Sequence, residues 1–220
     1  MHCGPFPIHD LSPRPSGALY WPEQRLLCVS DLHLGKSERM ARRGGTLLPP
    51  YETQETLARL DTELEATKAE RVICLGDSFD DGASLQGLAE DHRLWLIRLM
   101  AGRDWTWVEG NHDAGPLDIP GTHRAEVTIA ALTFRHQAQA GATAEVSGHF
   151  HPKVRLAGRA WRAFLADKHR IILPAFGAYT GGLWAEDPAF SGLMGPEAMA
   201  VLCGSSMLRI PMPRASTMAR

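Results

Sequence analysis

Short apolar runs and longer periodic segments alternate through the first half of the chain. Three runs suit buried strands: residues 25–30, 71–75 and 105–109. A further short strand is expected near residues 18–20. Each of the three main runs ends in a polar residue or a glycine, which is where a buried strand would reach the edge of a sheet.

The segments between these strands carry a different pattern. After Pro49 and Pro50, leucines at positions 57, 60 and 64 form one apolar stripe, which predicts a helix of about eighteen residues. Residues 85–100 predict a second helix that stops near Gly102. Residues 37–48, rich in Arg and Gly, predict a polar loop. The strand–loop–helix–strand–helix–strand order indicates a parallel α/β sheet.

The second half of the chain contains short strands and no clear helix. Strands are predicted at 127–135, 145–147, 153–157 and 170–175, with a late hairpin formed by 201–202 and 207–210. This pattern favours a second sheet packed on the first over one doubly wound sheet. We expect a single domain over residues 1–210, followed by a disordered tail at 211–220.

Composition narrows the possible classes of protein. The chain has 220 residues, of which 44% are hydrophobic and 22% charged, as in ordinary soluble globular proteins. Its net charge of -2 provides no overall basic field, so any nucleic acid would have to bind a local patch. No signal peptide or apolar run of the ~20 residues needed to span a membrane is visible. We therefore expect a cytoplasmic protein with no membrane partner. The four cysteines contain no Cys-x-x-Cys pair, the spacing typical of a zinc ribbon or a thioredoxin-type site.

Potential metal ligands recur at the ends of the apolar runs. They are Asp31, His33, Asp77, Asn111, His136, His149 and His151, with His112 directly after Asn111. The carboxyl ends of neighbouring parallel strands meet at one edge of a sheet, so these side chains are expected to converge. Aspartate and histidine are the residues that a two-metal hydrolytic site needs, because paired metals activate water and hold a phosphoryl group.

Each motif alone has a simpler explanation. The Asp31-x-His33 pair sits on a segment that we expect to be extended, with both side chains on one side, but a lone pair of this kind is usually a surface turn. A strand-end residue such as His136 is more often a satisfied core or surface histidine. The two histidines of Gly148-His149-Phe150-His151 suit a chelating pair on a strand edge. Only the combination of these motifs, in this order, specifies a dinuclear site.

These motifs resemble those of the calcineurin-like metallophosphoesterases. The resemblance covers residues 31–151 and implies a two-sheet α/β/β/α sandwich with two divalent metal ions, usually Mn²⁺, with Fe or Zn²⁺ as alternatives. It implies that Asp31, His33 and His151 bind the first metal. Asp77 would bridge the two metals, and Asn111, His136 and His149 would bind the second. His112 would face the scissile phosphate.

A closer resemblance, over about residues 16–184, is to the bacterial DNA-ligase-associated metallophosphoesterases. It is carried by four segments: Ser16 to Trp21, Asp31 to Lys36, Leu48 to Thr53 and Leu173 to Gly182. Members of that group are associated with a DNA ligase, a helicase and a second nuclease in DNA repair. The group often has His where this chain has Asp80, a difference that bears on substrate contacts more than on the metal ligands.

Two residues are expected to act in catalysis. His112 could stabilise the charge on the phosphoryl oxygens and protonate the leaving alkoxide. Asp113 would either orient His112 or cap the following turn, and the sequence leaves both roles open.

Substrate contacts are less clearly marked. Candidates are Arg39, Arg42 and Arg43 in the predicted polar loop, and Tyr179 in a glycine-rich segment that could form the rim of the site. A second basic cluster lies at Lys153, Arg155, Arg159, Arg162, Lys168 and Arg170, with Trp161 among them. Basic groups with an interleaved aromatic suit a nucleic-acid strand, although solvated strand faces and loops are the more common explanation.

The sequence supports three functions of different plausibility. The first is a metal-dependent phosphodiesterase or nuclease that acts on DNA ends or single strands in ligase-associated repair. The second is a phosphatase or phosphodiesterase for a small nucleotide-like phosphoester. The third, a non-catalytic scaffold, is disfavoured because all seven ligands and His112 are present.

Overall fold

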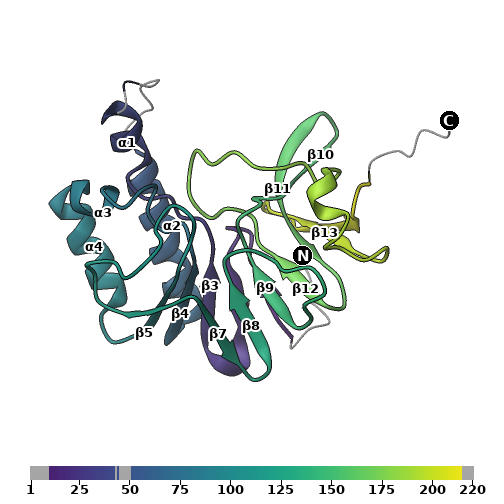
Figure 1. Ribbon diagram of the computed structural model, residues 1–220, viewed down its shortest axis with the longest axis horizontal. Coiled ribbons are helices and arrows are strands. Elements are labelled where there is room, and N and C mark those ends of the chain that lie inside the picture. Colours follow the sequence, from purple (N-terminus) through teal and green to yellow (C-terminus); the bar gives the residue numbers. More distant parts are fainter. Residues whose placement is uncertain (1–9, 43, 45–50, 215–220) are drawn as a thin grey trace.

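Two β-sheets lie face to face in the structure, a computed structural model that describes residues 10–42, 44 and 51–214 (Figure 1). The first sheet has the strand order β1-β2-β3-β4-β5-β6. Its strands are β1 (Ser12–Pro13), β2 (Leu19–Trp21), β3 (Leu26–Val29), β4 (Arg71–Leu75), β5 (Asp104–Val108) and β6 (Thr122–Arg124). The strands from β3 to β6 run parallel, so their carboxyl ends lie along one edge.

The second sheet has the order β14-β13-β11-β12-β9-β8-β7, with β10 paired to β11. Its strands are β7 (Glu126–Ile129), β8 (Leu132–Arg135), β9 (Glu145–Ser147), β10 (Lys153–Leu156), β11 (Arg159–Ala166), β12 (Arg170–Ile172), β13 (Met199–Leu202) and β14 (Leu208–Pro211). Most pairs are antiparallel, but β9 runs parallel to both of its neighbours, β8 and β12. The carboxyl ends of β8 and β9 therefore also lie side by side.

The four α-helices of the described chain all pack on the first sheet's side of the molecule (Figure 1). They are α1 (Lys36–Arg42), α2 (Glu52–Thr67), α3 (Ser84–Gly87) and α4 (Glu90–Met100). Leucines of α2 and α4 pack with strand residues of the first sheet in one apolar cluster. None of the described helices is long and apolar enough to cross a lipid bilayer.

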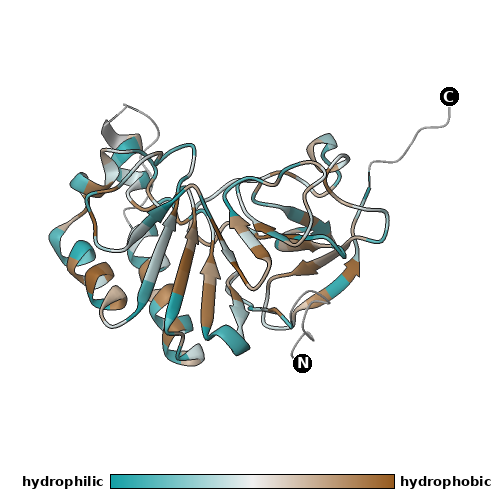
Figure 2. Ribbon diagram, turned by 60° about the horizontal axis from the view of Figure 1, so that its bottom comes forward, coloured by the Kyte–Doolittle hydropathy of each residue, from teal (hydrophilic) through white to brown (hydrophobic). Residues whose placement is uncertain are grey.

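The central strands show the alternation that creates two cores from one strand. In β4, Val72 and Cys74 face the helices, whereas Ile73 and Leu75 face the second sheet. Both faces of this strand are apolar because helices cover one side and the second sheet covers the other. In Figure 2 the central strands are accordingly brown along most of their length, while the helices carry both brown and teal.

The outer face of the second sheet has its own apolar cluster. Leu165 of β11 and Leu202 of β13 pack there against Phe190 and Met194. The covering segment is irregular and contains a short 3₁₀ helix, η2 (Pro188–Phe190), whereas the first sheet is covered by α-helices. The two-sheet α/β sandwich expected from the sequence is confirmed, with a thin outer layer on this side.

Several predicted elements are confirmed and others need correction. The parallel order of β3, β4 and β5 and the β13–β14 hairpin are confirmed. The prediction of a polar loop at 37–48 was wrong for its first part, which forms helix α1. Near the start of this helix, Ser37 donates its backbone N–H to the Glu52 carboxylate at 3.0 Å. Residues 45–50 lie outside the described residues.

Backbone geometry explains two further corrections. The helix predicted over 85–100 is interrupted at Leu88, which is extended (φ -61°, ψ 139°) and separates α3 from α4. The strand predicted over 127–135 folds into the hairpin β7–β8, because Ala130 and Ala131 both take left-handed conformations. Such conformations are uncommon for non-glycine residues, so this turn had no signal in the sequence.

The remaining differences are two strands that were not predicted and the beginning of the expected tail. Strands β6 and β11 were not predicted, since β6 is only three residues long and β11 carries charges among its apolar residues. The disordered tail expected at 211–220 is wrong for its first two residues, because Pro211 pairs with Met199 and Met212 is buried. Residues 215–220 lie outside the described residues.

Replacing Leu60 by Ala should lower the free energy of unfolding by about 2–5 kcal/mol, because Leu60 is completely buried between α2 and the first sheet. Leu94→Ala is the matched control, since Leu94 is 58% exposed. Denaturant unfolding of both variants measures the difference. Equal losses of stability would contradict the packing described here.

Candidate metal centre

The loops after five strands meet at one end of the two-sheet sandwich. Asp31 and His33 follow β3, Asp77 follows β4 and Asn111 follows β5, whereas His136 follows β8 and both His149 and His151 follow β9. The first sheet thus supplies four of the seven predicted ligands and the second sheet supplies three. The structure gathers the seven into two neighbouring groups.

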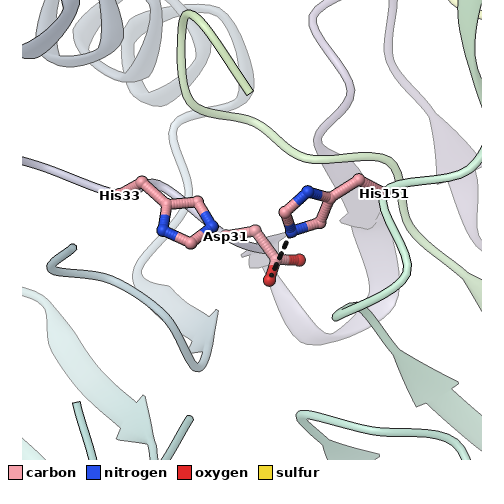
Figure 3. A group of neighbouring side chains, drawn as sticks. All are labelled: Asp31, His33 and His151. Carbon is pink, nitrogen blue, oxygen red and sulfur yellow. Dashed lines mark ion pairs between the residues drawn. The ribbon is translucent and has the colours of Figure 1, made fainter. Parts of the chain in front are cut away.

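Asp31, His33 and His151 form the first group (Figure 3). Their ligand atoms all lie within 4.8 Å of one another, and His151 Nε2 is 3.1 Å from Asp31 Oδ1. All three donor atoms, Asp31 Oδ1, His33 Nε2 and His151 Nε2, are buried, and apart from the ion-pair contact between Asp31 and His151 none has a partner with hydrogen-bond geometry in the described chain. A cation held between them would satisfy all three, so the donor set fits a metal ion.

The second group contains Asp77, His136 and His149, and Asn111 joins it. The Nε2 atom of His136 is the meeting point of the group. It lies 3.4 Å from Asp77 Oδ2, 2.9 Å from Asn111 Oδ1 and 3.1 Å from His149 Nδ1. Carboxylate, amide and imidazole donors aimed at one point likewise fit a divalent cation.

The two groups touch each other. His136 Nδ1 of the second group is 3.9 Å from Asp31 Oδ1 of the first. The charge of His136 in the second group and that of His33 in the first both lower the pKa of the Asp77 carboxyl. Asp77 therefore interacts with histidines of both groups. This position is compatible with the bridging role that the family resemblance implies for Asp77.

Opposite charges inside the site shift its titrating groups strongly. Burial would raise the pKa of Asp77, but the hydrogen bond and charge of His136 outweigh it and lower that pKa to about 2. Burial would lower the pKa of His136, but Asp77 and Asp31 raise it to about 9. Burial also opposes the charge on Asp31, whose pKa is nevertheless lowered by His151 and His136. The carboxylates therefore remain anionic and attract cations.

Five of the seven ligands have left-handed backbone conformations. Their φ angles are 54° for Asp31, 47° for His33, 47° for Asp77, 68° for His149 and 47° for His151. Strain of this kind concentrates at functional sites, where the surrounding structure enforces it. The extended segment expected at Asp31–His33 is thus wrong: β3 ends at Val29, and the two side chains converge through tight turns.

The His149–His151 pair does not chelate one metal. His149 points to the second group and His151 to the first, although they are two residues apart. The left-handed turns at both residues separate the side chains, whereas a straight strand would have placed them on the same face. The division between two metals agrees with what the family resemblance implies.

Two glycines allow the loops to approach one another. A Cβ on Gly148 would lie 1.6 Å from Ser30 Oγ and 2.5 Å from Asp31 Oδ2. A Cβ on Gly110 would lie 2.2 Å from Asp77 Oδ1. Any larger residue at these positions would displace a metal-binding carboxylate.

Asp113 does not orient the ring of His112. Its carboxylate accepts backbone N–H groups from Asp77 and Gly110 on Oδ1, and from Ser78 and Phe79 on Oδ2, at 2.7–3.2 Å. The residue is buried and joins the loop after β4 to the loop after β5. Its place among the predicted catalytic residues is therefore corrected to a structural one.

Asp80 was expected to bear on substrate contacts more than on the metal ligands, but the structure places it against one of the predicted ligands. It is buried, with Oδ1 3.0 Å from His33 Nδ1 and Oδ2 paired with Arg39 Nε. The carboxylate thus leaves His33 Nε2 directed at the metal group, as a second carboxylate commonly does for a ligating histidine. Its position in Asp77-Ser78-Phe79-Asp80, close behind a ligand, is the only signal that the sequence carries for it.

The predicted substrate-binding residues have different outcomes. Arg39 lies in α1 and is occupied by Asp80. Arg42 ends the same helix, but its side chain lies outside the described part, as does Arg43 altogether. Tyr179 is 45% exposed on the segment after β12, and its contact with substrate stays a prediction.

Comparison with known proteins agrees with this geometry. The model of the calcineurin-like phosphoesterases matches residues 24–177, which include every ligand described above.

The chain belongs to the calcineurin-like phosphoesterase family.

It is also similar to a solved structure, the Pseudomonas putida nuclease MPE. The two share 29% sequence identity with a TM-score of 0.71, over 96% of this chain and 100% of that one. No match was found among curated proteins.

Family membership shows the reaction class. Calcineurin-like phosphoesterases depend on two metals, and the two groups around Asp31 and Asp77 are the matching clusters in this chain. The protein is a metal-binding hydrolase that acts on phosphoester bonds.

Removing the carboxylate of Asp80 should weaken metal binding by about 10–100-fold, because His33 loses the group that orients its ring. Asp80→Ala, Asp77→Ala and the exposed control Asp104→Ala would be compared by Mn²⁺ titration calorimetry. Asp77→Ala should lose metal outright. An Asp80→Ala affinity equal to that of Asp104→Ala would contradict the role of Asp80.

Asp113→Asn should destabilise the fold by about 1–3 kcal/mol, because an amide nitrogen cannot accept the N–H groups that one carboxylate oxygen now receives. Thermal unfolding of the metal-free protein tests this, with Asp104→Asn as the control. Unchanged stability together with a large loss of kcat would restore the catalytic role for Asp113.

Proposed function

We propose that the protein is a metal-dependent phosphodiesterase that cleaves DNA as a nuclease. The observation that carries this proposal is the match to the Pseudomonas putida nuclease over nearly all of both chains. At 29% identity, the likeness is supported by sequence as well as fold. The complete set of candidate ligands supports a metal centre that can carry out this reaction.

The surroundings of the metal centre favour a large substrate over a small one. Much of the chain between Asn111 and His136 forms β6, β7 and β8, which pair within the two sheets. His112, at the mouth of the site, is 39% exposed. A polymer can reach such a surface, whereas small-molecule pockets usually enclose most of their ligand.

His112 is placed to act on the phosphate. Its Nδ1 is 3.1 Å from the carbonyl oxygen of Asp80, which can only accept a hydrogen bond, so Nδ1 carries the proton. Its Nε2 faces the site, 4.0 Å from Asp77 Oδ2. When doubly protonated, His112 can donate from Nε2 to the leaving oxygen as a general acid.

Two divalent ions held by these residues would activate a water molecule and neutralise charge on the phosphoryl group. We propose Mn²⁺, the metal that the family resemblance implies and that carboxylate and amide oxygens suit, with Fe or Zn²⁺, which imidazole suits, as alternatives. What the chain itself provides is a fixed set of donors, anionic carboxylates and a positioned proton at His112.

The finer assignment follows from the sequence motifs. We propose that the enzyme belongs with the DNA-ligase-associated metallophosphoesterases and works in DNA repair beside a ligase and a helicase. The alternative is a small nucleotide-like phosphoester as substrate, which the same metal centre could hydrolyse.

Parallel assays with Mn²⁺ separate these functions: bis-p-nitrophenyl phosphate, p-nitrophenyl phosphate and a labelled single-stranded oligonucleotide. Cleavage of the diester and the oligonucleotide is expected. Turnover of the monoester with an intact oligonucleotide would favour the small-molecule alternative.

His112→Asn should lower kcat for the diester by about 10²–10⁴-fold while the metal content stays unchanged, because only the proton donor is lost. His169→Asn is the control, since His169 is exposed on the turn after β11. Elemental analysis and steady-state kinetics measure the two quantities. Full activity of His112→Asn would remove this residue from the mechanism.

A further inference from the structure

Two adjoining hollows lead away from the metal centre. The first, of about 240 Å³, is lined by the ligand His151 together with Lys153, Trp161, Arg162 and Thr180, among others. The second, of about 220 Å³, is lined by Arg162 and Thr180 again, and by Arg59, Glu55 and Tyr179. Because Arg162 and Thr180 line both of them, the hollows adjoin each other, and together they define a path that begins at His151.

The path is positively charged although the whole chain is not. Lys153, Arg162 and Arg59 line it, and the one carboxylate of these linings, Glu55, is already paired with Arg59 at 2.6 Å. Burial, followed by the charge of Arg162, lowers the pKa of Arg59, so the two guanidinium groups repel each other where the hollows join. An anion bound between them would offset that repulsion.

The cations are held firmly relative to the metals. Arg162 Nη1 donates to the carbonyl of Ala175 at 2.9 Å, and Arg59 Nη1 donates to that of Phe176. This same segment is bonded to the metal loop, since Phe176 N donates to Ser30 O at 2.8 Å and Gly177 N to Asp31 O at 3.1 Å. Groups that bind a phosphate next to the reacting one need this fixed spacing.

The two aromatic residues of the path differ in availability. The ring of Trp161 is half-buried, with Arg159 lying over it at 5.0 Å and Gly204 close to its edge. Tyr179 is 45% exposed. Tyr179 is therefore the ring available for stacking on a base.

The remaining basic residues of the cluster noted in the sequence serve other purposes. Arg170 is buried and bonded to Glu145 and to the carbonyls of Gln139 and Ala142. Arg155 lies over the ring of Trp184, as Lys153 does from the edge of the path. Lys153 and Arg162 are thus the members of that cluster that line the first hollow.

We propose that the two hollows form one binding track for a single strand of DNA beside the metal centre. The phosphates of the strand contact the three cations, and one base stacks on Tyr179. This inference rests on the proposed nuclease function and specifies that its substrate is a single strand. Each hollow is smaller than the roughly 300–1,000 Å³ of a small-molecule pocket, which suits successive parts of an extended chain.

The first test measures binding without catalysis. A fluorescein-labelled oligo-dT would be titrated at several salt concentrations, using fluorescence anisotropy, with Mn²⁺-loaded protein that also carries His112→Asn, so that the metals are present and cleavage is slow. The double variant Lys153→Gln, Arg162→Gln should bind about tenfold or more weakly, and the salt dependence of log K should become shallower by about 0.7 for each phosphate that the variant no longer neutralises. The double variant Lys68→Gln, Arg71→Gln removes the same charges from exposed positions near the opposite end of β4 and should bind like the wild type.

Tyr179 provides a second test that spares the hydrogen bonds of Arg162. Tyr179→Ala should weaken binding by about 5–100-fold because the stacking ring is removed, whereas Tyr179→Phe should retain it. In Mn²⁺-dependent cleavage, the ratio of oligonucleotide to bis-p-nitrophenyl phosphate turnover should fall in Tyr179→Ala and in the Lys153, Arg162 double variant. Thermal unfolding identifies any variant that fails to fold. If the Lys153, Arg162 double variant fails, the comparison of Tyr179→Ala with Tyr179→Phe tests the track.

The outcomes distinguish the track from the function. A wild-type enzyme that hydrolyses the small diester but neither binds nor cuts the oligonucleotide would overturn the nuclease proposal, and the track with it. A wild type that cuts the strand, with track variants that bind it equally well and keep the wild-type salt dependence, would overturn the track alone.

Discussion

The hydrogen bond from the backbone N–H of His149 to Asp31 Oδ2, 3.0 Å long, joins the two sheets where the metal ligands converge. Asp31 belongs to the first sheet and His149 to the second, so neither sheet alone could form a complete metal group. The bond is possible because Gly148 has no Cβ to meet Ser30 and Asp31. The packing of the apolar faces between the sheets sets their distance, and this contact fixes the final position of the ligands.

Charge and backbone strain in the site depend on each other. Asp31 and Asp77 are kept anionic by surrounding histidines even though burial opposes their charge, and both lie at left-handed turns. Such an arrangement persists only where the rest of the fold enforces it. Asp113 contributes to that enforcement by accepting four backbone N–H groups from the loops that carry Asp77 and Asn111. A cation shared by the two ligand groups would relieve the concentrated negative charge, so metal binding and folding of these loops are expected to reinforce each other.

The residues that the sequence predicted as ligands do converge in the structure, because strand ends and polar residues leave a clear local pattern. It predicted the backbone between them poorly. The left-handed turns at Ala130 and Ala131 occur in residues with no preference for them, and the general enrichment of His in such conformations does not tell which histidines adopt them. Tertiary packing decides these positions. The role of Asp80 was missed for a related reason: its partners, His33 and Arg39, are distant in sequence and meet it only in the fold. For Asp113 the sequence left two roles open, and the structure shows the one that serves the backbone, because its carboxylate accepts N–H groups of the neighbouring loops.

The segment after β12 connects chemistry with substrate choice. Its backbone is bonded to Ser30 and Asp31 on one side, while its carbonyls at Ala175 and Phe176 hold Arg162 and Arg59 on the other. A phosphate on the proposed track would therefore be positioned by the same backbone that positions Asp31. Binding of a remote phosphate would therefore help to orient the reacting phosphate at the metals. In this way an extended substrate can react faster than a small diester. The metal ligands set the reaction, and the side chains attached to this segment set which phosphoester reaches it.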